Sequence, residues 1–205
     1  MSQGYYRYPT IAGDRIVFVC EDDLWSVSAE GGIATRLTAS FGMCSFPRFS
    51  PDGSSIAFIS TDEGNPEVYV MPASGGVPER LTFLGAAQAA VTGWSGDEIF
   101  FVANPTSWDE QTRPFAVSRS GSVREVHLGH ARSLATVDGN VVAVGRNAAD
   151  PARWKRYRGG TAGEIWIDLN ADGRFERLPL PDGNPTWPMP IGERVYFLAD
   201  HEGIG

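Results

Sequence analysis

Cysteine is scarce in this chain, which contains only Cys20 and Cys44 among 205 residues. Each cysteine lies beside apolar residues, and the two do not have the close paired spacing of a metal site. Free cysteine behaves as a small apolar side chain and is often buried. The sequence therefore predicts two buried, reduced thiols and no disulfide.

Histidine is almost as rare, with three in the chain. His127 and His130 fall in "EVHLGH", where their spacing in a strand or turn is a poor metal geometry, and His201 is expected in a loop. The stretch "GWSGD" from Gly93 lacks the Gly-x-Ser-x-Gly pattern of a nucleophile elbow, so we expect another strand and turn there. No Ser-His-Asp set can be assembled, and the chain is predicted to have no catalytic residues of its own.

Positive charge and long apolar runs are also in short supply. Lys and Arg number 17 against 25 Asp and Glu, a net charge of −8, which disfavours general binding to nucleic acid or to an anionic membrane. No apolar segment approaches the roughly 20 residues needed to span a bilayer. The first residues, "MSQGYYRYPTIAGD", do not form a secretory signal, so a cytoplasmic location is expected.

Turn-forming residues, in contrast, are abundant, with 24 Gly and 14 Pro. In "FSPDGSSIAFIS", the segment Ser50-Pro51-Asp52-Gly53 predicts a type I turn, and a β-rich run follows it. A Gly three residues before Ile or Val at the head of an apolar run recurs at intervals of 40, 43, 43 and 53 residues, at Gly13, Gly53, Gly96, Gly139 and Gly192. The stretch is one copy of an internal repeat.

Each complete repeat predicts four antiparallel strands. One strand precedes the repeated glycine, two follow it, and a short fourth strand comes last, as in "TRLT" from Thr35 and "ERLT" from Glu79. Four short strands every ~40–45 residues are typical of a β-propeller blade. The apolar period of about two excludes a solenoid of helix pairs, and an immunoglobulin-like sandwich would lack the internal similarity. The predicted fold class is all-β, a β-propeller of four-stranded antiparallel blades.

We expect one partial propeller over residues 1–205. Its predicted blades are 8–38, 46–82, 89–128, 131–180 and an incomplete fifth at 186–205. Propellers close as rings of about 4–8 blades, and closure protects the strand edges. A chain that stops in mid-blade is therefore expected to belong to something longer. Alone, its unpaired edge would favour aggregation or a homo-oligomer.

The long connection "RNAADPARWKRYRGGTAG" in the fourth blade is the clearest departure from the repeat. It concentrates positive charge and aromatic residues in an otherwise acidic chain, at Arg146, Arg153, Trp154, Lys155, Arg156, Tyr157 and Arg158. Guanidinium groups beside aromatic rings could bind a peptide carboxylate or acidic side chains, or could dock a neighbouring domain. A solvated loop that covers the blade's edge is the third interpretation.

The loop "DLNADGRFE" in the same blade is a candidate calcium site. Asp168, Asn170, Asp172 and Glu176 occupy positions 1, 3, 5 and 9 of an oxygen-rich loop, with Gly173 at the bend. Pro179 stands where the final Glu of an EF-hand would be. Because Asn, Asp and Gly also form ordinary turns, a plain β-turn is the alternative. No other cofactor is expected.

Two levels of resemblance follow from the quoted motifs. "FSPDGSSIAF", "VYVMPASGG" and "ERLT" resemble the PD40 repeat of TolB-type propellers, a WD40-like repeat. "GDRIVFVCEDDLWSV" over 13–27 and "VVAVGRNAADPARWKRYRGGTAGEIWIDL" over 141–169 resemble the first and fourth blades of the N-terminal six-bladed propeller of the tricorn protease family.

The narrower resemblance implies a six-bladed ring at the N-terminus of a cytoplasmic serine peptidase that degrades oligopeptides left by the proteasome or by other proteases. It implies partners in the same polypeptide, namely a second propeller, a PDZ domain and a catalytic core, and a role for this propeller as scaffold and as gate or channel for peptides. The chain alone would then be inactive. The alternatives are a free-standing TolB-like interaction propeller and the propeller cap of a prolyl-oligopeptidase-like hydrolase.

Overall fold

The computed structural model describes residues 4–105, 111–148, 159–168, 170–180 and 183–200. In this part of the chain every regular element is a β-strand, and no helix is long and apolar enough to cross a membrane. The strands form five antiparallel sheets that follow one another along the sequence.

Four of the sheets have four strands each. The first contains β1 (Arg7–Ala12), β2 (Arg15–Cys20), β3 (Asp23–Ser28) and β4 (Thr35–Arg36). The second contains β5 (Cys44–Phe49), β6 (Ser55–Ser60), β7 (Glu67–Pro72) and β8 (Glu79–Arg80). The third contains β9 (Ala89–Ser95), β10 (Glu98–Ala103), β11 (Arg113–Ser118) and β12 (Val123–Glu125). The fourth contains β13 (Ser133–Val137), β14 (Asn140–Arg146), β15 (Glu164–Ile167) and β16 (Glu176–Arg177).

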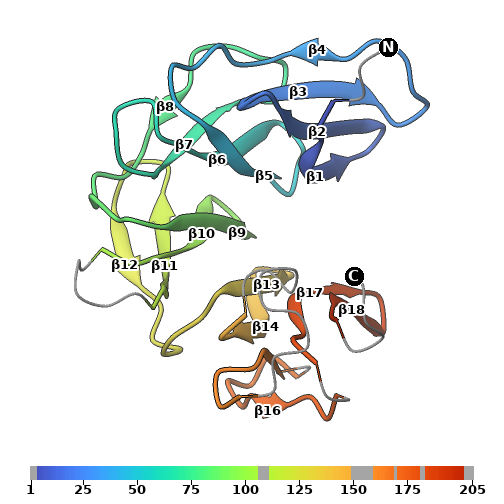
Figure 1. Cartoon of the computed structure of the whole chain (residues 1–205), viewed down its shortest axis with the longest axis vertical. Helices are drawn as coiled ribbons and strands as arrows, with labels where there is room; N and C mark the ends of the chain where they lie inside the picture. Colours follow the sequence, from blue (N-terminus) through green and yellow to red (C-terminus); the bar gives the residue numbers. More distant parts are fainter. Residues whose placement is uncertain (1–3, 106–110, 149–158, 169, 181–182, 201–205) are drawn as a thin grey trace.

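The fifth sheet pairs β17 (Thr186–Ile191) with β18 (Arg194–Leu198). Figure 1 shows the sheets arranged one after another in an arc, with β4, β12 and β16 toward its outside. The first strands of successive sheets, β1, β5, β9, β13 and β17, contact one another along the inside. This is the predicted β-propeller, and the fold class is confirmed.

The repeated glycines sit in the hairpins between the first and second strands. In the predicted turn, the Gly53 N–H donates to the Ser50 carbonyl at 2.8 Å, and Gly53 has a φ of +69° that residues with a side chain rarely adopt. The Ser50 hydroxyl donates to an Asp52 carboxylate oxygen at 2.6 Å, and this bond fixes the turn further. The predicted turn is confirmed, and its backbone explains why glycine recurs.

The core lies between neighbouring sheets. All six residues of β6 are buried, and its four apolar residues alternate between two clusters. Ile56 and Phe58 pack toward the first sheet, whereas Ala57 and Ile59 pack toward the third. A strand that is buried on both faces has a continuous run of apolar residues in its sequence, and "IAFI" is such a run here.

The outer strands are only two or three residues long, and buried polar bonds hold two of them. In the second sheet the Glu67 carboxylate is 1% exposed and accepts hydrogen bonds from the Thr82 hydroxyl and, at 2.8 Å, from the Gly85 N–H. The Thr82 hydroxyl oxygen in turn accepts the Val68 N–H at 2.8 Å, and Arg80 forms an ion pair with Glu67 at 3.3 Å.

The first sheet repeats this arrangement. The buried Asp23 carboxylate accepts from the Thr38 hydroxyl at 2.7 Å and from the Ser40 N–H at 3.1 Å, and Arg36 pairs with it. The Thr38 hydroxyl oxygen accepts the Leu24 N–H at 2.9 Å. The repeated "RLT" motif therefore supplies an arginine and a threonine to a buried carboxylate of the preceding strand.

The cysteines are free, as predicted. Cys44 is buried, and desolvation raises the pKa of its thiol, whereas Cys20 is only half-buried.

Replacing Thr82 with Val should destabilise the protein by about 1–3 kcal/mol, because the Val68 N–H and the Glu67 carboxylate would each lose a buried partner. Urea unfolding monitored by tryptophan fluorescence measures the change. Thr82→Ser restores the hydroxyl and should recover most of the loss, and Thr35→Val, at an exposed position of β4, should change little. Equal stability of the Val and Ser variants would contradict this role for the hydroxyl.

Candidate functional site

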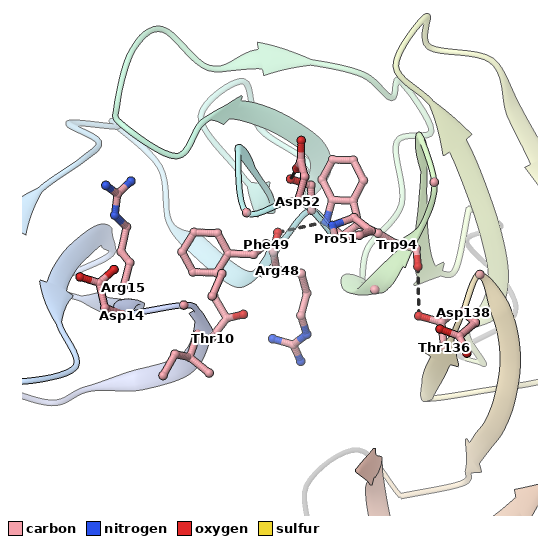
Figure 2. Close-up of a pocket in the computed structure, with 18 residues that line it drawn as sticks. Thr10, Asp14, Arg15, Arg48, Phe49, Pro51, Asp52, Trp94, Thr136 and Asp138 are labelled. Carbon is pink, nitrogen blue, oxygen red and sulfur yellow. Dashed lines mark hydrogen bonds between the residues drawn. The ribbon is translucent and has the colours of Figure 1, made fainter. Parts of the chain in front are cut away.

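The hairpins between the first and second strands of four sheets converge around a hollow of about 790 Å³ on the inside of the arc. Figure 2 shows its lining, which comes from Thr10–Arg15, Arg48–Gly53, Gly93, Trp94, Gly96, Thr136, Asp138 and Gly139. A second hollow of about 400 Å³ lies at the opposite ends of β1, β5 and β9 and at the start of β17, with Arg7, Tyr8, Phe46 and Trp187 among its lining residues. Both hollows lie along the inner strands of the arc, and we refer to this inner side of the propeller as its channel.

Hydrogen bonds between sheets join the second, third and fourth sheets at the channel. The indole N–H of Trp94 donates to the Arg48 carbonyl at 3.1 Å, and the Thr136 hydroxyl donates to the Trp94 carbonyl at 3.1 Å. Both bonds are drawn in Figure 2. The Ser95 hydroxyl adds a bond to the Gly139 carbonyl at 2.7 Å. The second, third and fourth sheets are thus tied together at the channel.

Carboxylates stand at the hairpin turns around the first hollow. Asp14, Asp52 and Asp138 all belong to its lining. The pKa of Asp52 is lowered to about 2, mainly by the hydrogen bond from the Ser50 hydroxyl and then by bonds from the Ser54 N–H and hydroxyl. The lining of the first hollow thus combines three carboxyl groups with the guanidinium groups of Arg15 and Arg48.

Aromatic side chains gather on the inner strands. Tyr8, Phe46 and Trp187 stand at equivalent positions of β1, β5 and β17, each in a β-bulge and each followed by proline. All three have φ between +50° and +52°, which is rare for residues other than glycine. The ring centres of Tyr8 and Phe46 are 4.2 Å apart, and those of Phe46 and Trp187 are 5.6 Å apart. The first, second and fifth sheets therefore meet through these three rings, which we call the aromatic cluster.

The structure describes only part of the predicted sites. Arg153, Trp154, Lys155, Arg156, Tyr157 and Arg158 lie outside the described residues, as does His201. Arg146 is described, and it donates to the Leu128 carbonyl at 2.9 Å with its guanidinium 5.5 Å from the centre of the Trp166 ring. The binding or docking role of this loop stays a prediction.

The candidate calcium loop is organised by its first residue. Asp168 is 3% exposed, and its carboxylate accepts the N–H groups of Asp172 and Gly173 at 3.2 and 2.7 Å. Asn170 and Glu176 are exposed. Across the described residues, no group of three or more His, Cys, Asp and Glu side chains is placed to hold a metal ion. The calcium site stays a prediction.

The other residues considered for a metal site or a nucleophile lie on the surface or in a strand and its turn. His127 and His130 are exposed, and "GWSGD" forms the end of β9 and the following turn, as expected. The aromatic cluster and Arg48 were missed. A usable signal existed, since "YP", "FP" and "WP" occur in three of the predicted first strands.

Comparisons with known proteins agree with this architecture. The family model described as "Tricorn protease N-terminal beta propeller domain" matches residues 3–205. This chain belongs to the tricorn protease N-terminal β-propeller family.

Among curated tricorn relatives, "Tricorn protease homolog 1" of Streptomyces coelicolor is 38% identical over 205 residues, which cover 98% of this chain and 19% of that protein. The chain thus spans about a fifth of the length of this relative. A "Putative Tricorn-like protease N-terminal subunit" of Sulfurisphaera tokodaii is 29% identical, and the match covers 82% of this chain and 88% of that one.

Among solved structures, the crystal structure of the tricorn protease superposes with a TM-score of 0.84 at 28% identity, covering 98% of this chain and 20% of that chain. TolB of Agrobacterium tumefaciens has a TM-score of 0.72 at 20% identity, covering 97% of this chain and 72% of that chain. The TolB likeness shows a shared fold alone.

Asp52 should give the tricorn propeller an acid-sensitive turn. Its folded pKa of about 2 lies below the ordinary 3.8, so the ionised carboxylate stabilises the fold above about pH 4, and this contribution is lost as pH falls toward 2. Asp52→Asn should therefore show a shallower fall in melting temperature between pH 4 and 2. Asp14→Asn removes a carboxylate at the equivalent turn of the first sheet and is the matched control for the loss of charge alone. Parallel curves for the wild type and Asp52→Asn would contradict the assignment.

Proposed function

We propose that this chain is the propeller portion of a serine peptidase of the tricorn type, which degrades oligopeptides released by the proteasome or by other proteases. In this proposal the propeller is a scaffold whose central channel admits or releases peptides beside a catalytic core carried elsewhere. The family match over residues 3–205 carries the proposal. The continuous, polar-rimmed hollow of about 790 Å³ supports the channel role, because a peptide backbone needs both space and hydrogen-bonding groups.

The catalytic core in this proposal lies outside the described residues. Hydrolysis of an amide needs an activated nucleophile or metal-bound water, together with a base and oxyanion donors. The exposed His127 and His130 are not part of such a set in the described residues. The core could belong to the same polypeptide, as the lengths of the long relatives suggest, or to a separate chain, as the name of the Sulfurisphaera relative suggests.

We expect residues 1–205 alone to cleave no peptide, and we expect the complete gene product, with any partner subunit that co-purifies, to do so. Fluorogenic peptides with and without a serine-directed covalent inhibitor measure this. Inhibitor-sensitive turnover by residues 1–205 would overturn the non-catalytic role. Absence of turnover by the complete protein would favour a free-standing interaction propeller.

The channel role has its own test. Thr10→Trp places a large ring in the first hollow and should slow hydrolysis of peptides several-fold in the complete protein. A small activated ester that reports on the nucleophile should be unaffected. Ile33→Trp, at a position 96% exposed outside the channel, is the matched control. Equal peptide turnover by the wild type and Thr10→Trp would remove the channel from the proposal.

A further inference from the structure

Bulky apolar side chains are exposed in the segments that lead into β1, β5 and β9. Tyr5 precedes β1 and is 80% exposed, Phe41 precedes β5 and is fully exposed, and Phe83 precedes β9 and is 75% exposed. Met43 is half-exposed and lines the second hollow. Because the second hollow lies at the start of these three strands, all four residues belong to the same end of the propeller. We call these four residues the apolar strip.

The part of the apolar strip beside β1 is joined to the part beside β5. The guanidinium carbon of Arg7 lies 5.7 Å from the centre of the Tyr5 ring, and Arg7 forms an ion pair with Asp22 at 3.1 Å. The Asp22 carbonyl accepts the N–H of Cys44, the residue after Met43, at 2.7 Å. Only a few contacts therefore separate Tyr5 from Met43.

The part beside β5 is joined in a similar way to the part beside β9. The Phe41 N–H donates to the Asp62 carboxylate at 2.7 Å. The next residue, Glu63, forms an ion pair with Arg80 at 2.6 Å. The guanidinium carbon of Arg80 in turn lies 4.2 Å from the centre of the Phe83 ring. The apolar strip thus crosses the first and second sheets, and its charged neighbours are paired with one another.

The backbone that carries Phe41 and Met43 is held firmly. The Asp62 carboxylate also accepts the Gly42 N–H at 3.3 Å, and the Thr61 hydroxyl oxygen accepts the Met43 N–H at 2.9 Å. At Gly42 the two segments lie so close that a Cβ would stand 2.4 Å from the backbone carbonyl carbon of Thr61. Rings on a fixed backbone lose little conformational entropy on binding, and aromatic residues and Met are enriched in protein interfaces.

The opposite end of the propeller has a different surface. Among its described residues the strongly exposed apolar side chains are aliphatic, and they include Ile33 and Val77 on the turns between the third and fourth strands of two sheets. The hairpins around the first hollow carry the carboxyl groups of Asp14, Asp52 and Asp138. An exposed aromatic surface of this kind marks a protein contact, and the propeller offers it at the end with the second hollow.

We infer that the apolar strip is the surface on which the catalytic core of the proposed peptidase docks, so that the second hollow faces the core. The inference rests on the proposed function, in which the core lies beside the channel, and it adds which end of the channel that is. The match covers 19% of the Streptomyces relative, so most of a protein of that length is available to contact its propeller. Where the core is a separate chain, a non-covalent surface of this kind holds the two together.

Photo-crosslinking in the complete protein, with any partner subunit that co-purifies, tests the inference. In three variants the photoreactive residue benzoylphenylalanine replaces Phe41, Phe83 or Ile33, and mass spectrometry identifies the crosslinked peptides. We expect positions 41 and 83 to crosslink to the catalytic core, and position 33 to give little or no such product. Ile33 is the matched control because it is equally accessible at the opposite end of the propeller.

A second substitution tests whether Phe41 contributes to the docking. Phe41→Ser, combined with the photoreactive residue at position 83, should lower the yield of core crosslinks about tenfold, which corresponds to about 1.4 kcal/mol of docking free energy. Ile33→Ser in the same background should leave the yield unchanged. Because the Phe41 side chain is fully exposed and its N–H bond to Asp62 remains possible, the substitution should not affect folding of the propeller.

The inference would be overturned by crosslinks from positions 41 and 83 to a second copy of the propeller, or to no protein at all. Equal or greater core crosslinking from position 33, or an unchanged yield with Phe41→Ser, would also overturn it. These readouts do not depend on turnover. An inactive complete protein whose remaining part crosslinks to the apolar strip would refute the proposed function and keep the docking surface, whereas an active protein without these crosslinks would do the reverse.

Discussion

The requirement that a sheet be buried on both faces governs this structure. Every residue of β6 is buried, and its side chains alternate between the neighbouring sheets on either side. A sheet of this kind is stable only when flanked by others, so the blades must follow one another in an arc and their first strands must meet inside it. The channel, its hairpin rim and the positions of its side chains are consequences of that packing.

Packing alone would leave the outer strands poorly held, since β4 and β8 have two residues each. The buried carboxylates of Asp23 and Glu67 compensate by binding the threonine and arginine of the "RLT" motif. Isolated buried charges are costly, but these two have several hydrogen bonds each. The apolar contacts thus set where the sheets lie, and polar bonds fix where each sheet ends.

The fold could be read from the sequence because its signals are local and repeated. Glycine at a positive φ recurs at intervals of 40–53 residues, and the strands that follow it alternate or run apolar. The candidate site could not be read in the same way. Arg48 is one arginine in a short strand, and its position in the channel depends on the bulge that shifts the register between Ser45 and Arg48. The pair Phe46-Pro47 marks the bulge in the sequence, but the direction in which the following side chain points depends on pairing with the neighbouring strand.

The aromatic cluster is formed at a conformational cost to the backbone. Its members are Tyr8, Phe46 and Trp187. A left-handed backbone costs a residue with a side chain about 1–2 kcal/mol, and here three such residues share one cluster. Each bulge changes the direction in which its aromatic side chain points and so turns the ring inward; in a regular strand the same side chain would point another way. Three residues with strained backbones therefore meet at one contact between sheets, so the free energy gained by packing their rings is partly offset by the conformations that bring the rings together.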